Sequence, residues 1–163
     1  MQIIILNRQK KLPISKGAIK TIVINTFKFL LNADSRRLHT DGRRLARREN
    51  LRASAGQLTI LYTDNKTIQE LNYRFAGKDE PTDVLCFDLS QEGRLIADIV
   101  ISTEKAWENS RLFNTSPRWE ANLYLVHGIL HLLGYRDRKR KDRICMQRKA
   151  LWILRRLEDN KVS

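Results

Sequence analysis

The stretch His127-Gly-Ile-Leu-His131-Leu-Leu-Gly-Tyr-Arg-Asp137 decides how this chain of 163 residues is interpreted. Two of its three histidines lie there, four residues apart, in an apolar run that predicts a helix. Residues at i and i+4 lie one above the other on a helix, so both imidazoles can face one metal ion. Gly134 predicts the end of that helix. A ligand soon after it would complete a three-ligand site with one position left for water, and Asp137 is the best placed side chain.

Two carboxylates near the histidine pair have more than one interpretation. Asp137 can ligate a metal, cap the last helix, or pair with the basic residues 138–143. Glu120 lies two helical turns before His127, where it can accept a hydrogen bond from a ligand histidine or act on a bound water. It can equally favour the start of the helix through the helix dipole. The metalloprotease motif H-E-x-x-H has Gly128 at its second position here, so a peptidase would lack its general base.

The composition indicates a basic globular chain. The formal net charge is +13 and the pI is near 10.2, which favours an anionic partner such as nucleic acid. A hydrophobic content of 42% is enough for a core, and the length suits one domain. No apolar run is long enough for a bilayer, and the N-terminal segment lacks the order of a signal peptide. We therefore expect a cytoplasmic protein without membrane attachment, with Cys86 and Cys145 as reduced thiols.

Basic residues gather in two segments. Residues 34–54 contain seven arginines between Arg36 and Arg52, and residues 136–143 read RDRKRKDR. Both segments can hold RNA phosphates, although 34–54 can also be a solvated loop that only raises solubility. His39 lies in the first segment and is interpreted as a surface histidine. The candidate RNA contacts are Arg43, Arg44, Arg47, Arg48, Arg138, Lys139 and Arg140.

Apolar periodicity and capping residues predict the order of the elements. The predicted strands cover residues 2–6, 57–63, 84–89 and 95–102, and Gly93 predicts a hairpin between the last two. The predicted helices cover 15–31, about 65–75, 102–113, 116–134 and 137–157. Asp64 or Asn65 is the predicted cap of the second, and Ser102 and Ser116 are the predicted caps of the third and fourth. No internal repeat or long linker divides the chain.

Taken together, three motifs resemble the YbeY-type rRNA maturation endoribonucleases, which are small bacterial metal-dependent hydrolases. The family pattern H-G-x-L-H-L-x-G-Y-D-H corresponds to HGILHLLGYRD at 127–137. The pattern L-N-x-x-Y-R-x-K-D-x-P-T-D-V-L-S-F corresponds to LNYRFAGKDEPTDVLCF at 71–87, and G-D-I-V-I-S to ADIVIS at 97–102. The motifs lie in the family's order, and the match covers about residues 57–150. Residues 34–54 are a basic insertion relative to the pattern.

The resemblance implies a fold and a metal site. The expected fold is α/β (α+β), a single zincin-like domain over residues 1–163 with a mixed sheet of about four strands and about five helices. His127 and His131 correspond to two zinc ligands of the family. Asp137 falls where the family has its third histidine ligand, and Arg136 falls on the preceding aspartate. One Zn²⁺ per chain and no small-molecule cofactor are therefore expected.

The resemblance also suggests roles for residues outside the metal site. Arg74 matches an arginine of the family's active-site groove, and its guanidinium suits a phosphate. It can also be a solvent-facing helix residue paired with Glu70. Asp83 matches the family's Thr-Asp pair, where it can orient a ligand histidine or cap the local turn. Arg74 and Glu120 are the catalytic candidates.

The expected function follows from these assignments. The resemblance implies a single-strand-specific metallo-endoribonuclease that acts in maturation of the 3′ end of small-subunit (16S) rRNA and in ribosome quality control. Its partners would be rRNA, the small ribosomal subunit and its assembly proteins. The alternative is an rRNA-binding assembly factor whose catalysis is weakened by the loss of the third histidine. A metallopeptidase is a third interpretation, which Gly128 disfavours.

Overall fold

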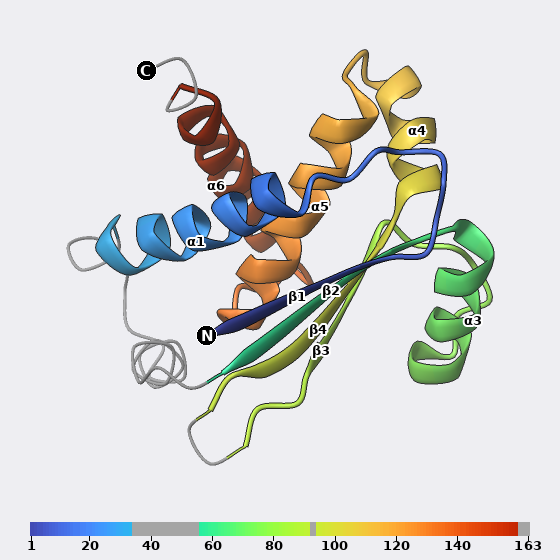
Figure 1. The fold of residues 1–163 in the computed structure, drawn as a ribbon, viewed down its shortest axis with the longest axis horizontal. Coiled ribbons are helices and arrows are strands. Elements are labelled where there is room, and N and C mark those ends of the chain that lie inside the picture. The colour runs from blue at the N-terminus through green and yellow to red at the C-terminus, as the bar shows by residue number, and fades with distance from the viewer. Residues whose placement is uncertain (34–55, 92–93, 160–163) are drawn as a thin grey trace.

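Strands and helices follow one another in the order that the apolar patterns predict. The computed structural model describes residues 1–33, 56–91 and 94–159 (Figure 1). The basic segment 34–54, with its four candidate RNA contacts Arg43, Arg44, Arg47 and Arg48, lies outside the described residues. The elements are β1 (Gln2–Asn7), α1 (Lys16–Ala33), β2 (Gln57–Thr63), α3 (Asn65–Ala76), β3 (Val84–Asp88), β4 (Ile96–Ser102), α4 (Thr103–Leu112), α5 (Pro117–Leu132) and α6 (Arg140–Asp159).

The described strands form one mixed sheet in the order β1-β2-β4-β3. Strands β1, β2 and β4 are parallel, and β3 runs antiparallel to β4 with Val84 opposite Ile101. The predicted mixed α/β fold and the hairpin between the last two strands are therefore confirmed. Among the strands that the structure describes, β3 pairs only with β4 and lies at the edge of the sheet. Its first residue is close to the candidate site described below.

Helix α5 is the centre of the layer that carries the histidines. Helices α1, α5 and α6 lie together on one side of the sheet, and α3 lies on the other (Figure 1). Nine residues of α5 are buried, which is expected of a helix that is apolar around most of its circumference. A Cβ added at Gly128 would come within 2.9 Å of Ile99 Cγ2 and 3.1 Å of Cys86 Sγ. Glycine at this position therefore lets α5 pack directly against β3 and β4.

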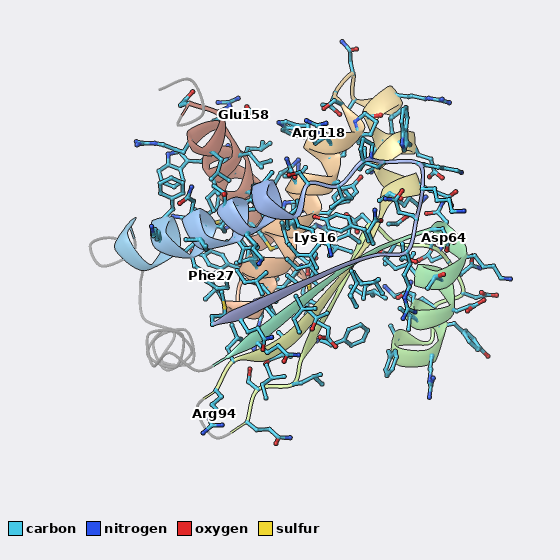
Figure 2. All side chains as sticks on the ribbon, in the orientation of Figure 1. Lys16, Phe27, Asp64, Arg94, Arg118 and Glu158 are labelled. Atoms are coloured by element: carbon cyan, nitrogen blue, oxygen red, sulfur yellow. The ribbon has the colours of Figure 1, made fainter. Side chains whose placement is uncertain are left out.

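The predicted capping residues begin their helices. Asp64, labelled at the start of α3 in Figure 2, accepts a hydrogen bond from the amide three residues on. Ser102 and Ser116 do the same at the starts of α4 and α5. Each side chain satisfies an amide that has no partner inside its own helix. No helix in the described ranges is long and apolar enough to cross a bilayer.

The chain turns sharply after α5. Gly134 has a positive φ of 85°, and the amide of Tyr135 donates to the carbonyl of Leu130 at 3.0 Å, as in a glycine-terminated helix. Tyr135 is buried, which fixes the direction of the following segment. The last helix begins at Arg140 and not at Asp137. The interpretation of Asp137 as the cap of that helix is therefore wrong, because the turn and the buried tyrosine keep residues 135–139 non-helical.

Candidate metal centre

A cavity of about 330 Å³ lies between the start of β3, the second half of α5 and the start of α6. It brings together four residues that the sequence singles out, from two parts of the chain that lie far apart in sequence. These residues are Asp83, His127, His131 and Asp137. The full lining is Thr82, Asp83, Val84, His127, His131, Asp137, Arg143, Met146 and Gln147.

His127 presents a buried nitrogen that the protein leaves without a partner. Within the described part of the chain, its Nε2 makes no hydrogen bond although it is inaccessible to solvent. Burial is the largest influence on this imidazole and lowers its pKa, and the nearby charge of Asp83 opposes that effect. His127 is therefore neutral at physiological pH, which is the form that ligates metals. An unsatisfied buried nitrogen beside a cavity is expected when an absent ligand or ion completes its bonding.

His131 is held in the orientation that a ligand needs. Its Nδ1 lies 3.2 Å from the carbonyl oxygen of Tyr135, so the proton resides on Nδ1 and the lone pair on Nε2. That Nε2 lies 3.8 Å from Oδ2 of Asp137. Backbone carbonyls commonly orient ligand histidines in this way. The glycine turn after α5 therefore does two things, since it positions the carbonyl that orients His131 and it returns Asp137 toward the same nitrogen.

The side chains around the cavity are of the types that bind a divalent cation, but they are not close enough together to hold one. Two ligands on a tetrahedral zinc ion with bonds of about 2.0–2.2 Å are about 3.4 Å apart, so His131 and Asp137 are only slightly too far apart at 3.8 Å. In the described residues, no three His, Cys, Asp or Glu side chains are already gathered closely enough to hold a metal. Asp137 is about half exposed and is free to rotate the small distance required. Two imidazoles and one carboxylate are a donor set that zinc accepts.

Asp83 faces the cavity but makes its hydrogen bonds locally. Its Oδ1 accepts from the amide of Val84 at 2.8 Å and from the hydroxyl of Thr82 at 3.1 Å. These contacts agree with the local-turn interpretation. The influence of Asp83 on the metal site is electrostatic, because its negative charge raises the pKa of His127 against the effect of burial. A carboxylate here also attracts a cation to the cavity.

The structure does not place Arg74 in this cavity. Arg74 is exposed on α3, on the other side of the sheet, and its guanidinium carbon lies 5.6 Å from the ring centroid of Phe75. Counted from Leu71 in the second motif, the family's arginine falls on Ala76. The motif therefore does not align Arg74 with the family's arginine. A role for Arg74 in RNA binding rests only on its location beside β3.

Glu120 also lies away from the cavity lining. It is 3% exposed, and its carboxylate accepts a hydrogen bond from the hydroxyl of Thr115 at 2.5 Å. It is also close enough to Tyr124 to raise the pKa of that phenol, although burial is the larger cause. Glu120 thus joins the start of α5 to the turn before it. Arg138, Lys139 and Arg140 are exposed in the segment that leads into α6.

Sequence reasoning missed the side chains that α6 contributes. Arg143, Met146 and Gln147 line the cavity, and Arg143 adds a guanidinium to the lining. Their spacing of three and four residues marks one face of a helix. That spacing is visible in the sequence, which predicts Met146 on an apolar stripe of the last helix but places none of the three residues at the site. Packing of α6 against α5 is what turns this face toward the histidines.

The chain is similar in sequence to known proteins. The profile of the family described as Endoribonuclease YbeY matches residues 4–158. A protein named Endoribonuclease YbeY from Anaeromyxobacter dehalogenans (strain 2CP-C) is 37% identical over 129 residues, which is 72% of this chain and 67% of that protein. A protein of the same name from Carboxydothermus hydrogenoformans (strain ATCC BAA-161 / DSM 6008 / Z-2901) is 38% identical over 107 residues, covering 64% of this chain and 75% of its own.

Two further facts concern how much of a relative's length is matched and which solved structure is similar in fold. The match spans only 58% of the length of the Endoribonuclease YbeY of Lysinibacillus sphaericus (strain C3-41). The solution structure of TM1509 from Thermotoga maritima has a TM-score of 0.54 with 24% identity, over 94% of this chain and 89% of that one. At this level of identity the likeness concerns the fold.

A mixed sheet, a helix that presents two histidines and a carboxylate returned by a turn together make a site whose residue types suit a divalent cation. With the profile match over nearly the whole chain, the particular family is clear. The chain belongs to the family described as Endoribonuclease YbeY.

Proposed function

We propose that this protein is a single-strand-specific metallo-endoribonuclease that acts in maturation of the 3′ end of 16S rRNA and in ribosome quality control. Its partners are then rRNA, the small ribosomal subunit and its assembly proteins, and it works in the cytoplasm. The observation that carries the proposal is the pair of imidazoles facing one cavity, one of them with a buried and unsatisfied Nε2. The net charge of +13 supports a polyanionic substrate.

The proposed cofactor is one Zn²⁺ ion, held by His127, His131 and Asp137. A cation held there supplies Lewis-acid polarisation of a phosphoryl oxygen when it is bound. Asp137 adds a negative charge where a third histidine would add none. The ion should consequently be held firmly, but it should acidify water less than it would between three imidazoles.

The protein's own residues bind and orient the substrate. Arg143, which lines the cavity, is the guanidinium placed to contact the phosphate at the point of cleavage. Arg138, Lys139 and Arg140 bind the backbone further along, and the arginines of segment 34–54 are proposed to do the same. Arg74 binds a flanking nucleotide from the other side of β3.

Glu120 and Asp83 act through other residues. Glu120 is proposed to position the histidine helix, because its buried carboxylate joins the start of α5 to Thr115. Asp83 is proposed to adjust the histidine site through its charge, which acts on the pKa of His127. Neither role requires contact with RNA.

Metal analysis tests the site directly. The purified protein should contain about one zinc per chain by inductively coupled plasma mass spectrometry, and His131→Ala should lose it. His39→Ala is the matched control, since it removes the third histidine of the chain and leaves the pair intact. Wild-type protein without bound metal, or His131→Ala with undiminished metal, would refute the site.

Cleavage tests the activity. A labelled RNA that contains the 3′ precursor region of 16S rRNA should be cut by wild type in its unpaired part, and not when a complementary strand covers that part. Arg143→Ala should cut more slowly while retaining metal, whereas Arg143→Lys should recover part of the rate. Equal cutting of paired and unpaired strands would contradict the proposed specificity.

A further inference from the structure

An aromatic surface lies across the edge strand from the cavity. Phe75, near the end of α3, is 61% exposed, and its ring packs edge-on against Phe87 of β3 with centroids 5.0 Å apart. The guanidinium of Arg74 lies over Phe75 at 5.6 Å from the centroid. Side chains project outward from this helix (Figure 2). We call Arg74, Phe75 and Phe87 the α3–β3 surface.

Core packing does not explain this surface. Phe75 has more than half of its area in solvent and contributes little to the core, where Ile68 and Asn72 are the buried residues of α3. An exposed phenylalanine fixed by a second ring behind it and a cation beside it presents a rigid apolar face next to a positive charge. Proteins that hold single-stranded nucleic acid use this combination, because bases stack on the ring and the arginine contacts the backbone.

The surface is continuous with the cavity through β3. Val84, the first residue of β3, lines the cavity, and Phe87 follows three residues later, about 10 Å along an extended strand. Alternate residues of a strand face opposite sides, so Phe87 faces α3 while Val84 and Cys86 face α5. Strand β3 is at the edge of the sheet. A nucleic acid strand can therefore pass over this edge with its backbone in the cavity and a neighbouring base against Phe75.

We propose that Phe75, supported by Phe87 and Arg74, stacks on an unpaired base next to the site of cleavage. The inference rests on the proposed function, since it takes single-stranded RNA as the substrate. It adds a physical reason for single-strand specificity. In a duplex both faces of each base are covered by its neighbours, so only an unpaired base can offer a face to the ring.

Binding of short oligoribonucleotides tests the stacking. The affinity of a fluorescein-labelled 12-nucleotide strand is measured by anisotropy for the full-length protein, with a gel after each titration to confirm that the strand is intact. Phe75→Ala should weaken binding by about 5- to 150-fold, the usual effect of losing one base–aromatic stack. Phe75→Trp should bind at least as tightly as wild type. Phe75→Leu keeps an apolar contact with Phe87 but should bind as weakly as Phe75→Ala.

Tyr73→Ala is the matched control. Tyr73 is 63% exposed, so it resembles Phe75 in exposure, but it lies two residues away and points to a different side of α3. This variant should bind within twofold of wild type. A second control uses strands in which abasic sites replace the bases. Wild type should bind them more weakly, and Phe75→Ala should then cause little further loss.

The outcomes separate this inference from the proposed function. Phe75→Ala with wild-type affinity, an equal loss on abasic strands, or a wild type that does not bind single-stranded RNA would each overturn the stacking. If Phe75 variants behave as expected but the protein contains no metal and cuts no RNA, the stacking stands and the proposed function fails. If the protein binds metal and cuts RNA while Phe75→Ala is silent, only the stacking fails.

Discussion

Replacing Gly128 by alanine is the sharpest test of how α5 holds the histidine pair. The added Cβ would lie 2.9 Å from Ile99 Cγ2 and 3.1 Å from both Ile99 Cδ1 and Cys86 Sγ. Ile99 is fully buried in β4, which has a strand on each side, and its branched side chain has few alternative rotamers. The crowding therefore cannot be relieved by the isoleucine alone, and α5 must move away from the sheet.

Two opposing terms set the magnitude. Overpacking of a close-packed core costs about 1–3 kcal/mol. Replacing glycine by alanine within a helix returns roughly 0.5–1 kcal/mol. The difference between the midpoints of these two ranges leads us to expect that Gly128→Ala lowers the free energy of unfolding by about 1 kcal/mol. The outward movement of α5 carries His127 with it, so the variant should also bind metal less tightly.

Urea unfolding and metal titration measure these two effects. Gly17→Ala is the matched control, because Gly17 lies in α1 and a Cβ there would meet no atom within 4 Å. That variant should be as stable as wild type or slightly more stable, with unchanged metal affinity. Both variants gain the helix preference of alanine. The difference in their free energies of unfolding therefore measures the effect of crowding at Gly128.

A second substitution tests the cause. Cys86→Ala removes one of the crowded atoms, so its combination with Gly128→Ala should cost less than the sum of the single changes. If Gly128→Ala is as stable as Gly17→Ala and keeps wild-type metal affinity, the close approach of α5 to β3 and β4 is not what positions His127.

Three further predictions concern thiols, pH and salt. At pH 8 iodoacetamide should modify exposed Cys145 on the order of 100-fold faster than Cys86, because burial raises the pKa of Cys86 to about 12; equal rates in peptide mass spectra would contradict this. Burial lowers the pKa of His127 below its ordinary 6.5, so unfolding of the metal-free protein takes up a proton at low pH. The free energy of unfolding should therefore decrease as pH falls below about 6.5. Urea unfolding at pH 7.5 and 5.5 measures this decrease, and His127→Gln should not show it. Alanine at positions 138, 139 and 140 together should reduce the slope of log affinity for single-stranded RNA against log salt by about 2, and an unchanged slope would exclude phosphate contacts there.

Local sequence determined the elements and the histidine pair. Asp64, Ser102 and Ser116 mark helix starts because each can bond an amide only a few residues away. Gly134 ends α5 because its φ of 85° strains other residues. The spacing of His127 and His131 places both on one helix face through helix geometry alone. These features depend on neighbours within about one turn, so the sequence predicts them without knowledge of the fold.

The tertiary structure decided what surrounds the pair. Sequence patterns did not reveal that Arg143 of α6 joins the cavity, that Arg74 lies across the sheet from it, or that Asp137 precedes the last helix without capping it. In the sequence, Gly128 stands out only because it occupies the position of the peptidase base. In the structure, a Cβ there would crowd Ile99, so Gly128 is the point where α5 packs against the sheet. Except for the local turn at Asp137, these facts depend on the packing of segments that are distant in sequence, and such packing is fixed by the order of strands and the volumes between layers.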